Sequence, residues 1–128
     1  ATAGVVRAIP AAGDRRGEAC AVAWGGLLAA GYEDGGLAAW DPRDPRPVAL
    51  WDGVHSAACR SVSWRPGGRH LAVASMDGTV SVLDPTRPEQ RVLLPGHTDR
   101  VVRCVWHPTR PMLVTSSADA TVRVWTAF

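Results

Sequence analysis

The residues of this chain that could support chemistry gather near its C-terminal end. His97 and Asp119 supply the base and carboxylate types of a hydrolase triad. A hydroxyl from Thr115 or Ser117 lies between them in sequence, and Trp125 follows. No Gly-x-Ser-x-Gly turn accompanies them to expose a nucleophile. The absence of this turn favours a structural role for these side chains over a catalytic one.

The same residue types recur twice earlier in the chain, each time incompletely. The second set has Leu83 where a tryptophan is expected, and the first has Arg15 where a histidine is expected. The members that remain are His55, Ser75 and Asp77 in the second set and Asp34 and Trp40 in the first. A catalytic set would not be expected to recur in eroded copies. We therefore expect a complete set only in the third copy.

The copies follow a period of about 42 residues, which is visible in two residue types. They are Trp24, Trp64 and Trp106, which lie 40 and 42 residues apart, and Asp34, Asp77 and Asp119, which lie 43 and 42 apart. Repeats of roughly 40 to 45 residues built of short strands are typical of β-propeller blades. The period therefore predicts units of a circular array, a form suited to holding partners.

Local patterns predict short strands joined by tight turns. Residues 79–83 and 121–125 alternate with period two, which places successive side chains on opposite faces of a strand. Asp77-Gly78 predicts a hairpin because glycine tolerates the positive φ that the turn needs; residues 34–35 repeat this signal, and residues 119–120 depart from it. No window has a sustained helical period, so we expect an all-β fold.

These motifs resemble the WD-repeat (WD40) β-propeller family. Gly-His before the first strand, Asp in the second turn and Trp or Trp-Asp at the end of the third strand recur in register. The resemblance covers nearly all of the chain from Val5 to Trp125. It implies that the histidine, hydroxyl, aspartate and tryptophan of a repeat form a buried structural tetrad.

The resemblance also implies one partial propeller domain over residues 1–128, with repeats at about 4–41, 47–84 and 91–125. Each repeat would be an outer strand of one blade followed by three inner strands of the next. Because propellers usually contain four to eight blades, we expect part of a larger ring with six to eight. The remaining blades would come from the rest of a longer chain or from a partner. Self-association of a short protein is the alternative.

Composition limits the possible functions. The chain is 46% apolar and 20% charged, which is typical of a globular protein with a core. All 14 basic residues are arginines, and the formal charge is only +2. The arginines are scattered, without the basic runs of a nucleic-acid surface, so we expect no direct nucleic-acid binding. No stretch approaches the roughly 20 apolar residues of a membrane span, so we expect no membrane partner.

The cysteines and the remaining histidines carry no ligand pattern. Cys20, Cys59 and Cys104 are odd in number and widely spaced. Cys59 and Cys104 fall at inward-pointing strand positions, and we expect them to be small buried side chains in a reducing intracellular compartment, cytoplasmic or nuclear. His70 and His107 have no recognisable ligand spacing, and the sequence contains no phosphate loop or dinucleotide fingerprint. The sequence therefore predicts no metal site and no cofactor.

The resemblance implies a docking surface on the narrow face of the propeller, around its central channel. Residues just after the histidine and just before the aspartate of each repeat form this face in the family. The matching positions are Glu18, Cys20 and Glu33, then Ala58, Arg60 and Met76, then Arg100, Val102 and Ala118. We favour Arg60, Arg100 and Met76, because arginine and methionine are enriched at interfaces. Ordinary solvent exposure is the alternative for each.

A second candidate surface lies at the end of the first repeat. Residues 40–43, which are Trp40, Asp41, Pro42 and Arg43, resemble the Trp-Asp-x-Arg box by which WD-repeat substrate receptors join the adaptor of cullin-RING ubiquitin ligases. The upstream residues that broadly follow this box are Leu28, Ala29, Ala30, Gly31, Asp34 and Leu37, whereas Ala39 departs from it. A rigid turn containing Pro42, Pro45 and Pro47 accounts for the same segment.

We therefore expect a non-catalytic protein-interaction scaffold that is a propeller subunit of a multiprotein assembly. The alternative is a substrate receptor of a cullin-RING ubiquitin ligase that uses Trp40, Asp41 and Arg43. An enzyme with a site on the channel is the third hypothesis. It has the least support, because the sequence offers no acid, base or metal set outside the predicted tetrad.

Overall fold

The computed structural model describes residues 4, 8, 9 and 17–126. These residues form strands and no helix, which confirms the prediction of an all-β chain. Accordingly, this part of the chain has no helix long and apolar enough to cross a membrane. In chain order the strands are β1 (Ala19–Trp24), β2 (Leu28–Tyr32), β3 (Leu37–Trp40), β4 (Pro47–Trp51), β5 (Cys59–Trp64), β6 (Leu71–Ser75), β7 (Val80–Leu83), β8 (Arg91–Leu94), β9 (Val101–Trp106), β10 (Leu113–Ser117) and β11 (Val122–Trp125).

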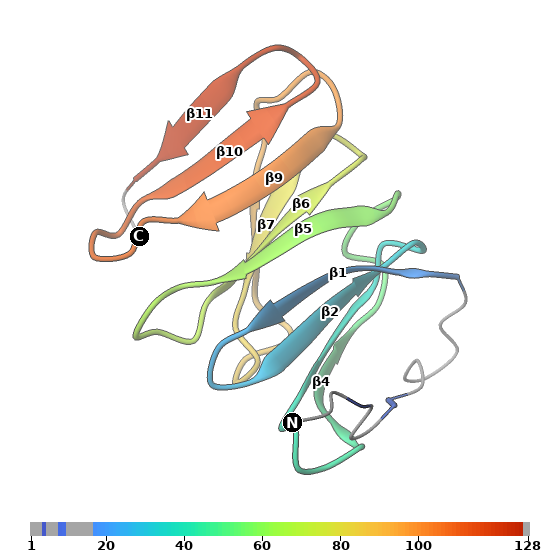
Figure 1. Ribbon diagram of the computed structural model, residues 1–128. Helices are drawn as coiled ribbons and strands as arrows, with labels where there is room; N and C mark the ends of the chain where they lie inside the picture. The colour runs from blue at the N-terminus through green and yellow to red at the C-terminus, as the bar shows by residue number, and fades with distance from the viewer. Residues whose placement is uncertain (1–3, 5–7, 10–16, 127–128) are drawn as a thin grey trace.

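The strands form three antiparallel sheets that stand side by side as propeller blades (Figure 1). Blade 1 contains β1 to β4, blade 2 contains β5 to β8, and blade 3 contains β9 to β11, each in chain order. The first strands of successive blades are neighbours, β1 with β5 and β5 with β9. The exposed residues of β1, β5 and β9 therefore lie together on one inner surface of the array.

Three similar turns join the second and third strands of the blades. In each turn one residue has positive φ and donates its N–H to the carbonyl three residues back. These residues are Gly35 (φ 85°, to Tyr32), Gly78 (φ 87°, to Ser75) and Ala120 (φ 69°, to Ser117). Glycine suits this left-handed conformation because it has no Cβ. Ala120 accepts it as the only non-glycine residue with positive φ in the described part of the chain.

Alternate residues of the strands pack one blade on the next. The buried contact between blades 1 and 2 includes Leu37, Ala39, Trp51, Cys59, Leu71, Val73 and Leu83. The contact between blades 2 and 3 includes Ala72, Ala74, Val80, Val82, Val101, Trp106 and Leu113. Blade 2 is thus covered on both faces, which explains why β6 and β7 are apolar along nearly their whole length.

A tryptophan at the end of each first strand marks the packing direction. Trp64 donates its Nε1–H to Ala23 O of blade 1 (3.3 Å), and Trp106 donates to Ser63 O of blade 2 (3.0 Å). Trp24 has the same place in blade 1, but 70% of its surface is exposed. The described blades therefore leave the first face open, as expected for part of a larger propeller.

The predicted first outer strand at residues 4–10 and the predicted role of Arg15 fall largely outside the described residues. Residues 4, 8 and 9 are described and lie in no strand. Ile9 packs against a buried cluster that contains Tyr32 and Trp40 on blade 1. The repeat boundaries proposed above stay a prediction.

The approach of blade 1 to the connection before blade 2 generates a prediction. A Cβ added at Gly35 would collide with the carbonyl oxygen of His55, whereas a Cβ at Gly53 (φ 63°) would meet no atom within 4 Å. Both Gly35→Ala and Gly53→Ala incur the left-handed strain of about 1 to 2 kcal/mol. Gly35→Ala must also displace backbone, so we expect it to lower stability by about 1 to 3 kcal/mol more. Thermal melts of the intact protein check this, and equal melting temperatures would contradict the close approach.

Candidate functional site

Blade 3 contains a connected set of buried polar side chains. His97 Nδ1 lies 2.9 Å from Asp119 Oδ2, and His97 Nε2 lies 2.8 Å from Thr115 Oγ1. Trp125 donates its Nε1–H to Thr115 Oγ1 (2.9 Å). Because the tryptophan can only donate and the carboxylate accepts, the Thr115 proton points to His97 Nε2, and Nδ1 carries the histidine proton. The set therefore has one consistent direction of donors, from Trp125 through Thr115 and His97 to Asp119.

Asp119 is held as a carboxylate by further donors. Thr121 donates to it through both its hydroxyl and its N–H, and Thr98 donates its N–H to Oδ2 (3.0 Å). Donation from the Thr121 hydroxyl holds the pKa of Asp119 below its ordinary value. Burial opposes this shift in part, and the hydrogen bond from His97 adds to it. The His97 side chain is 0% exposed and that of Asp119 is 6% exposed. This arrangement links the connection before β9 to the turn between β10 and β11.

The structure assigns the hydroxyl of this set to Thr115, not to Ser117. Ser117 Oγ donates to the carbonyl oxygens of Asp99 (3.1 Å) and Arg100 (2.8 Å), and it accepts the N–H of Asp119 (3.1 Å). Ser117 therefore ties the same turn to the start of β9. It supports the position of Asp119 without contacting His97.

In blade 2, too, the hydroxyl that contacts the histidine is not the serine that the sequence predicted. His55 Nδ1 lies 3.0 Å from Asp77 Oδ2, but its Nε2 meets Ser81 Oγ at 2.9 Å, and Ser75 takes the place of Ser117. Val73 stands where blade 3 has its hydroxyl, and the strand register places Ser81 directly opposite Val73. The hydroxyl has thus moved to the neighbouring strand. Its sequence signal is a lone serine within the apolar strand β7.

The blade 2 pair becomes less stable in acid. Burial lowers the pKa of His55, opposed by Asp77. Burial raises the pKa of Asp77, but donation from the hydroxyl and N–H of Thr79 brings it below its ordinary value. Both groups therefore bind protons less readily in the folded state than in the unfolded chain. By linkage, their contribution to stability is present at neutral pH and falls as pH drops below about 6.5 for the histidine and 4 for the aspartate.

Blade 1 keeps only fragments of the tetrad. Asp34 Oδ1 accepts the N–H of Gly36 (2.9 Å), which shapes the turn. Ala30 occupies the position where blade 3 has the hydroxyl of Thr115. It lies on β2, which pairs with β3, and it belongs to the same buried cluster as Trp40. The Trp40 side chain is 2% exposed, and its Nε1–H has no hydrogen-bond partner in the described structure. This buried donor is the clearest defect in the repeat.

None of these polar sets is open to a substrate. The histidines of blades 2 and 3 are buried, and their neighbours are already bonded to one another. Within residues 4, 8, 9 and 17–126 there is no group of three histidine, cysteine or acidic residues that could hold a metal ion. Burial raises the pKa values of Cys59 and Cys104 to about 12 and also raises that of Cys20, so none is an activated thiolate.

The predicted narrow-face residues lie around the starts of the inner strands. The exposed ones are Glu18, Glu33, Arg60, Met76, Arg100, Val102 and Ala118, and Cys20 and Ala58 are half-buried. Glu18 and Glu33 lie together on blade 1, where the Glu18 N–H donates to Glu33 Oε2 (3.1 Å). Blades 2 and 3 present arginines instead. The face is therefore acidic on blade 1 and basic on blades 2 and 3.

A hollow of about 360 Å³ runs across the inner strands beside this face. It is lined by Ala21, Val22, Arg60, Ser61, Val62, Val102 and Arg103. Val22 and Arg103 were not among the sequence candidates, because the prediction considered positions at the strand ends. Val22 is exposed between the half-buried residues Ala21 and Ala23, so the alternation of β1 is a signal that could have found it. Arg103 directly follows the exposed Val102, so alternation along β9 does not single it out.

The segment that resembles the ligase box forms a self-contained turn. Arg43 makes a two-pronged contact with Asp41, Nε to Oδ1 at 3.0 Å and Nη2 to Oδ2 at 2.8 Å. The Arg43 contact lowers the pKa of Asp41 to about 2. The Arg43 side chain is nonetheless 88% exposed, while Trp40 is buried. The box residues are thus split between a surface turn and the blade interior.

The blade 3 network generates a prediction about folding. His97→Ala would remove the acceptor of the Thr115 hydroxyl and one donor to Asp119 Oδ2, so we expect a loss of about 1 to 3 kcal/mol in unfolding free energy. His70→Ala, which removes an exposed histidine, is the matched control and should change stability by no more than about 0.5 kcal/mol. Thermal and urea melts of the intact protein measure both. Equal stability of the two variants would mean that the network does not support the blade.

The orphaned indole of blade 1 generates a second prediction. Ala30→Thr places a hydroxyl where Thr115 accepts from Trp125 in blade 3, while Ala30→Val adds the same volume without a hydroxyl. Valine is ordinarily the better core residue, because it buries no polar atom. Here we expect the threonine variant to be the more stable by about 1 kcal/mol, since it pairs the Trp40 Nε1–H. A higher melting temperature for the valine variant would contradict the assignment.

Comparison with known sequences and structures places these blades. The WD domain, G-beta repeat family matches residues 48–84 and 88–126. WD repeat-containing protein 90 of Xenopus tropicalis is 36% identical over 99 residues, which cover 77% of this chain and 5% of that protein. Protein LST8 homolog of Drosophila melanogaster is 29% identical over 105 residues, which cover 77% of this chain and 33% of that protein. This chain therefore spans a third or less of the length of these relatives.

The fold has a solved counterpart. The crystal structure of RRP9 WD40 repeats superposes with a TM-score of 0.84 at 16% identity, covering 94% of this chain and 38% of that chain. At this identity the similarity shows the fold alone, and it agrees with three blades of a larger propeller. Together with the repeat matches over more than half of the residues, it shows that this chain belongs to the WD-repeat family of β-propellers.

Proposed function

We propose that this chain is a non-catalytic scaffold that docks a protein segment on its narrow face. Membership of the WD-repeat family supports a protein-interaction role in general. The observation that carries the proposal is the hollow across β1, β5 and β9, which sets Arg60 and Arg103 beside the apolar side chains of Val22 and Val102. Arginine next to exposed aliphatic surface is the composition of an interface core.

The charges of this face favour an acidic partner segment on blades 2 and 3. Arg60, Arg100 and Arg103 make no ion pair with any described residue, so their guanidinium groups can donate hydrogen bonds to a partner's carboxylate. Glu18 and Glu33 repel such a segment at blade 1, which would fix its orientation. The segment would therefore lie with its acidic part toward blade 3.

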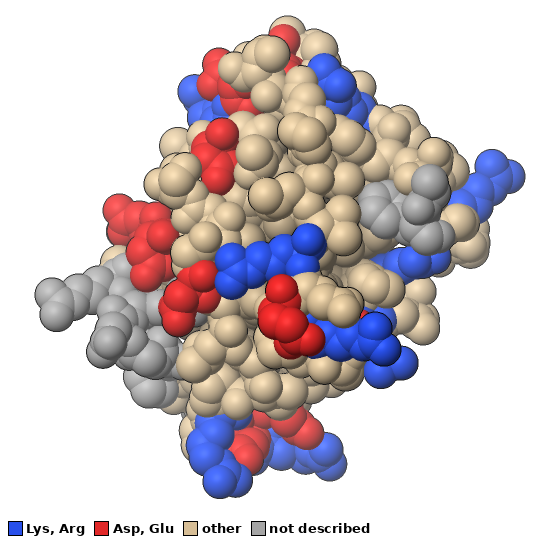
Figure 2. All heavy atoms as spheres, turned by 180° about the vertical axis from the view of Figure 1, so that it is seen from behind, with Lys and Arg blue, Asp and Glu red and all other residues tan. Residues whose placement is uncertain are grey.

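The partner we propose is a protein and not a nucleic acid. On the face shown in Figure 2, arginines and acidic side chains lie next to one another and neither sign forms a continuous field. The exposed turn of residues 41–46 likewise pairs the two signs, in the ion pairs Arg43–Asp41 and Arg46–Asp44. A nucleic-acid platform needs a continuous basic surface. We further propose that the protein works within a multisubunit assembly in a reducing compartment, which the three free cysteines favour.

The ubiquitin-ligase alternative has its own residue to test. Arg43 is exposed as that function requires, but its guanidinium is paired with Asp41 and would have to exchange this contact for one with an adaptor. Such an exchange gains little net energy, because one charged contact replaces another. We therefore keep the ligase receptor as the second hypothesis.

Charge reversal separates the two hypotheses. Arg60→Glu combined with Arg100→Glu should weaken association with co-purifying proteins by about tenfold or more, because each reversal replaces attraction by repulsion of the acidic segment. Arg110→Glu, on an exposed turn at the other end of blade 3, is the matched control and should leave association unchanged. Affinity purification with identification of the bound chains, alongside a thermal melt of each variant, gives the readout.

The outcomes have distinct meanings. Loss of bound chains in the double variant, with melting temperature intact, supports the narrow face. Loss of a ligase adaptor in Arg43→Glu, with the double variant unaffected, supports the ligase receptor. If neither change affects any bound chain, both surfaces are wrong as docking sites.

A further inference from the structure

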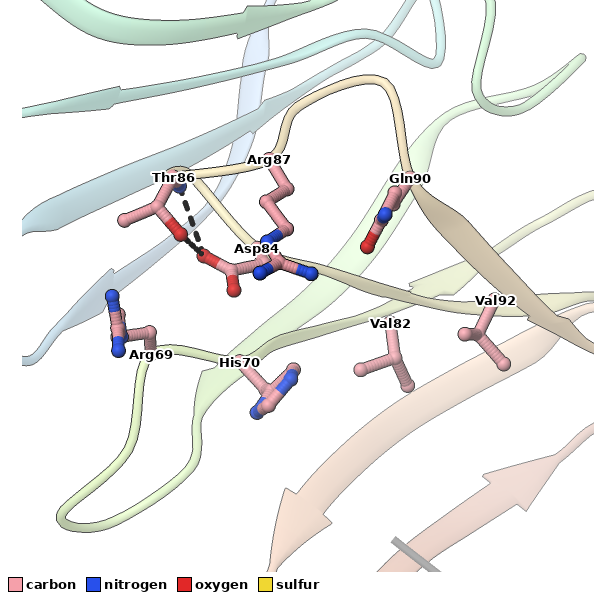
Figure 3. Close-up of a pocket in the computed structure, with 8 residues that line it drawn as sticks. All are labelled: Arg69, His70, Val82, Asp84, Thr86, Arg87, Gln90 and Val92. Atoms are coloured by element: carbon pink, nitrogen blue, oxygen red, sulfur yellow. Dashed lines mark hydrogen bonds between the residues drawn. The ribbon is translucent and has the colours of Figure 1, made fainter.

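The face opposite the proposed docking surface carries a separate polar hollow on blade 2. Its volume is about 240 Å³, and it lies between the turn of residues 65–70, which joins β5 to β6, and the loop of residues 84–90, which joins β7 to β8 (Figure 3). Arg69 and His70 come from the turn, and Arg87 and Gln90 come from the loop. Val82 and Val92 line it from β7 and β8. Two elements distant in sequence thus bring cations and an amide donor around one space.

The guanidinium groups of this hollow are free. Neither Arg69 nor Arg87 has a side-chain hydrogen bond or ion pair with any residue in the described part of the chain. Arg43 and Arg46 are by contrast each paired with an aspartate of their own turn. Arg65, on the same turn as Arg69, is also engaged, because it lies over the Trp106 ring at 5.6 Å from the centroid.

One carboxylate shares the hollow and is already occupied. Asp84 Oδ1 accepts the hydroxyl of Thr86 (2.7 Å) and its N–H (2.9 Å), as the dashed lines of Figure 3 show. Burial raises the pKa of Asp84, but Thr86 and the charges of His70 and Arg69 bring it below its ordinary value. Asp84 is thus ionised, and it offsets one of the two free arginines. The hollow keeps an uncompensated positive charge.

An apolar hollow adjoins the charged one. It has a volume of about 120 Å³, is lined by Leu27, Trp64 and Pro85, and shares Arg69 and Thr86 with the first. Its surface is mainly apolar, because the side chains of Leu27, Trp64 and Pro85 form much of its wall. Arg69 therefore stands on the boundary between a place for an aliphatic side chain and a place for an anion.

We propose that this face of blade 2 binds a short peptide segment in which an aliphatic side chain lies next to an acidic one. The carboxylate is received between Arg69 and Arg87, with the Gln90 amide as a further donor, and the aliphatic side chain fills the hollow at Trp64. A carboxylate suits the site better than a phosphate dianion, because one uncompensated charge remains beside Asp84. This site is independent of the narrow face.

The test uses a defined probe on the intact protein. The probe is acetyl-Leu-Gly-Glu-amide with a photoreactive diazirine leucine, and the crosslinked residues are located by mass spectrometry. We expect crosslinks within residues 64–69 and 84–87 that saturate at millimolar probe. The Gln form of the probe should label these segments at least about tenfold less, since it loses the charge-assisted bonds. Arg69→Gln and Arg87→Gln should each reduce labelling similarly, with unchanged melting temperature.

The control and the contrary outcomes are equally defined. Arg110→Gln removes an exposed arginine that lines neither hollow and should leave labelling unchanged. Labelling outside the two segments, equal labelling by the Gln probe, or no saturation at millimolar probe would overturn the site. Stronger protection by a phosphoserine competitor than by its glutamate counterpart would overturn the assignment to a carboxylate. Intact labelling in the Arg60→Glu and Arg100→Glu protein separates this site from the narrow face.

Discussion

The bond between a histidine before a blade and an aspartate within it is the constraint on which this structure depends. In blade 3, His97 belongs to the connection that leaves blade 2, and Asp119 belongs to the turn between β10 and β11. Their contact therefore holds the connection between blades 2 and 3 against the β10–β11 turn of blade 3. Such a buried polar pair is stabilising only when every donor and acceptor in it is satisfied. Thr115, Thr121, Thr98 and Trp125 supply those partners.

The same constraint builds the proposed docking face. Arg100 follows His97 on the connection, and Ala118 precedes Asp119 in the turn, with the Ala118 N–H donating to Arg100 O (3.0 Å). Residues of this face are thus held by the network beneath them without belonging to it. Because of this separation, the exposed positions can differ with the partner while the buried hydrogen bonds that stabilise the blade are kept. It also explains why a set with the residue types of a hydrolase need not do chemistry.

The sequence predicted what repeats along the chain and missed what depends on contacts across it. The tryptophan and aspartate period predicted the blades, because each blade needs the same packing residue and the same turn. The role of Ser81 was not predicted, because it follows from the position of Ser81 opposite Val73 in the strand register and not from its place in the repeat. The hollow around Arg69 was not predicted for a similar reason, since the β5–β6 turn and the β7–β8 loop that form it are separate in the sequence. Val22 and Arg103 lie within β1 and β9, away from the positions next to the histidine and the aspartate of each repeat that the family resemblance implies.

Aspartates pin the loops at both ends of the blades, and this decides which arginines are available. At one end Asp77 and Asp119 hold the connections between blades. At the other, Asp84 closes its loop on Thr86, while Asp41 closes the equivalent loop of blade 1 on Arg43. The substitution of threonine for arginine at that position removes the local cation from the carboxylate. Blade 1 also lacks counterparts of the two free arginines, because its turn at residues 25–27 contains no arginine and Asp44 stands where blade 2 has Arg87. Several differences between equivalent loops, and not one alone, thus place the cations of Arg69 and Arg87 around the hollow of blade 2.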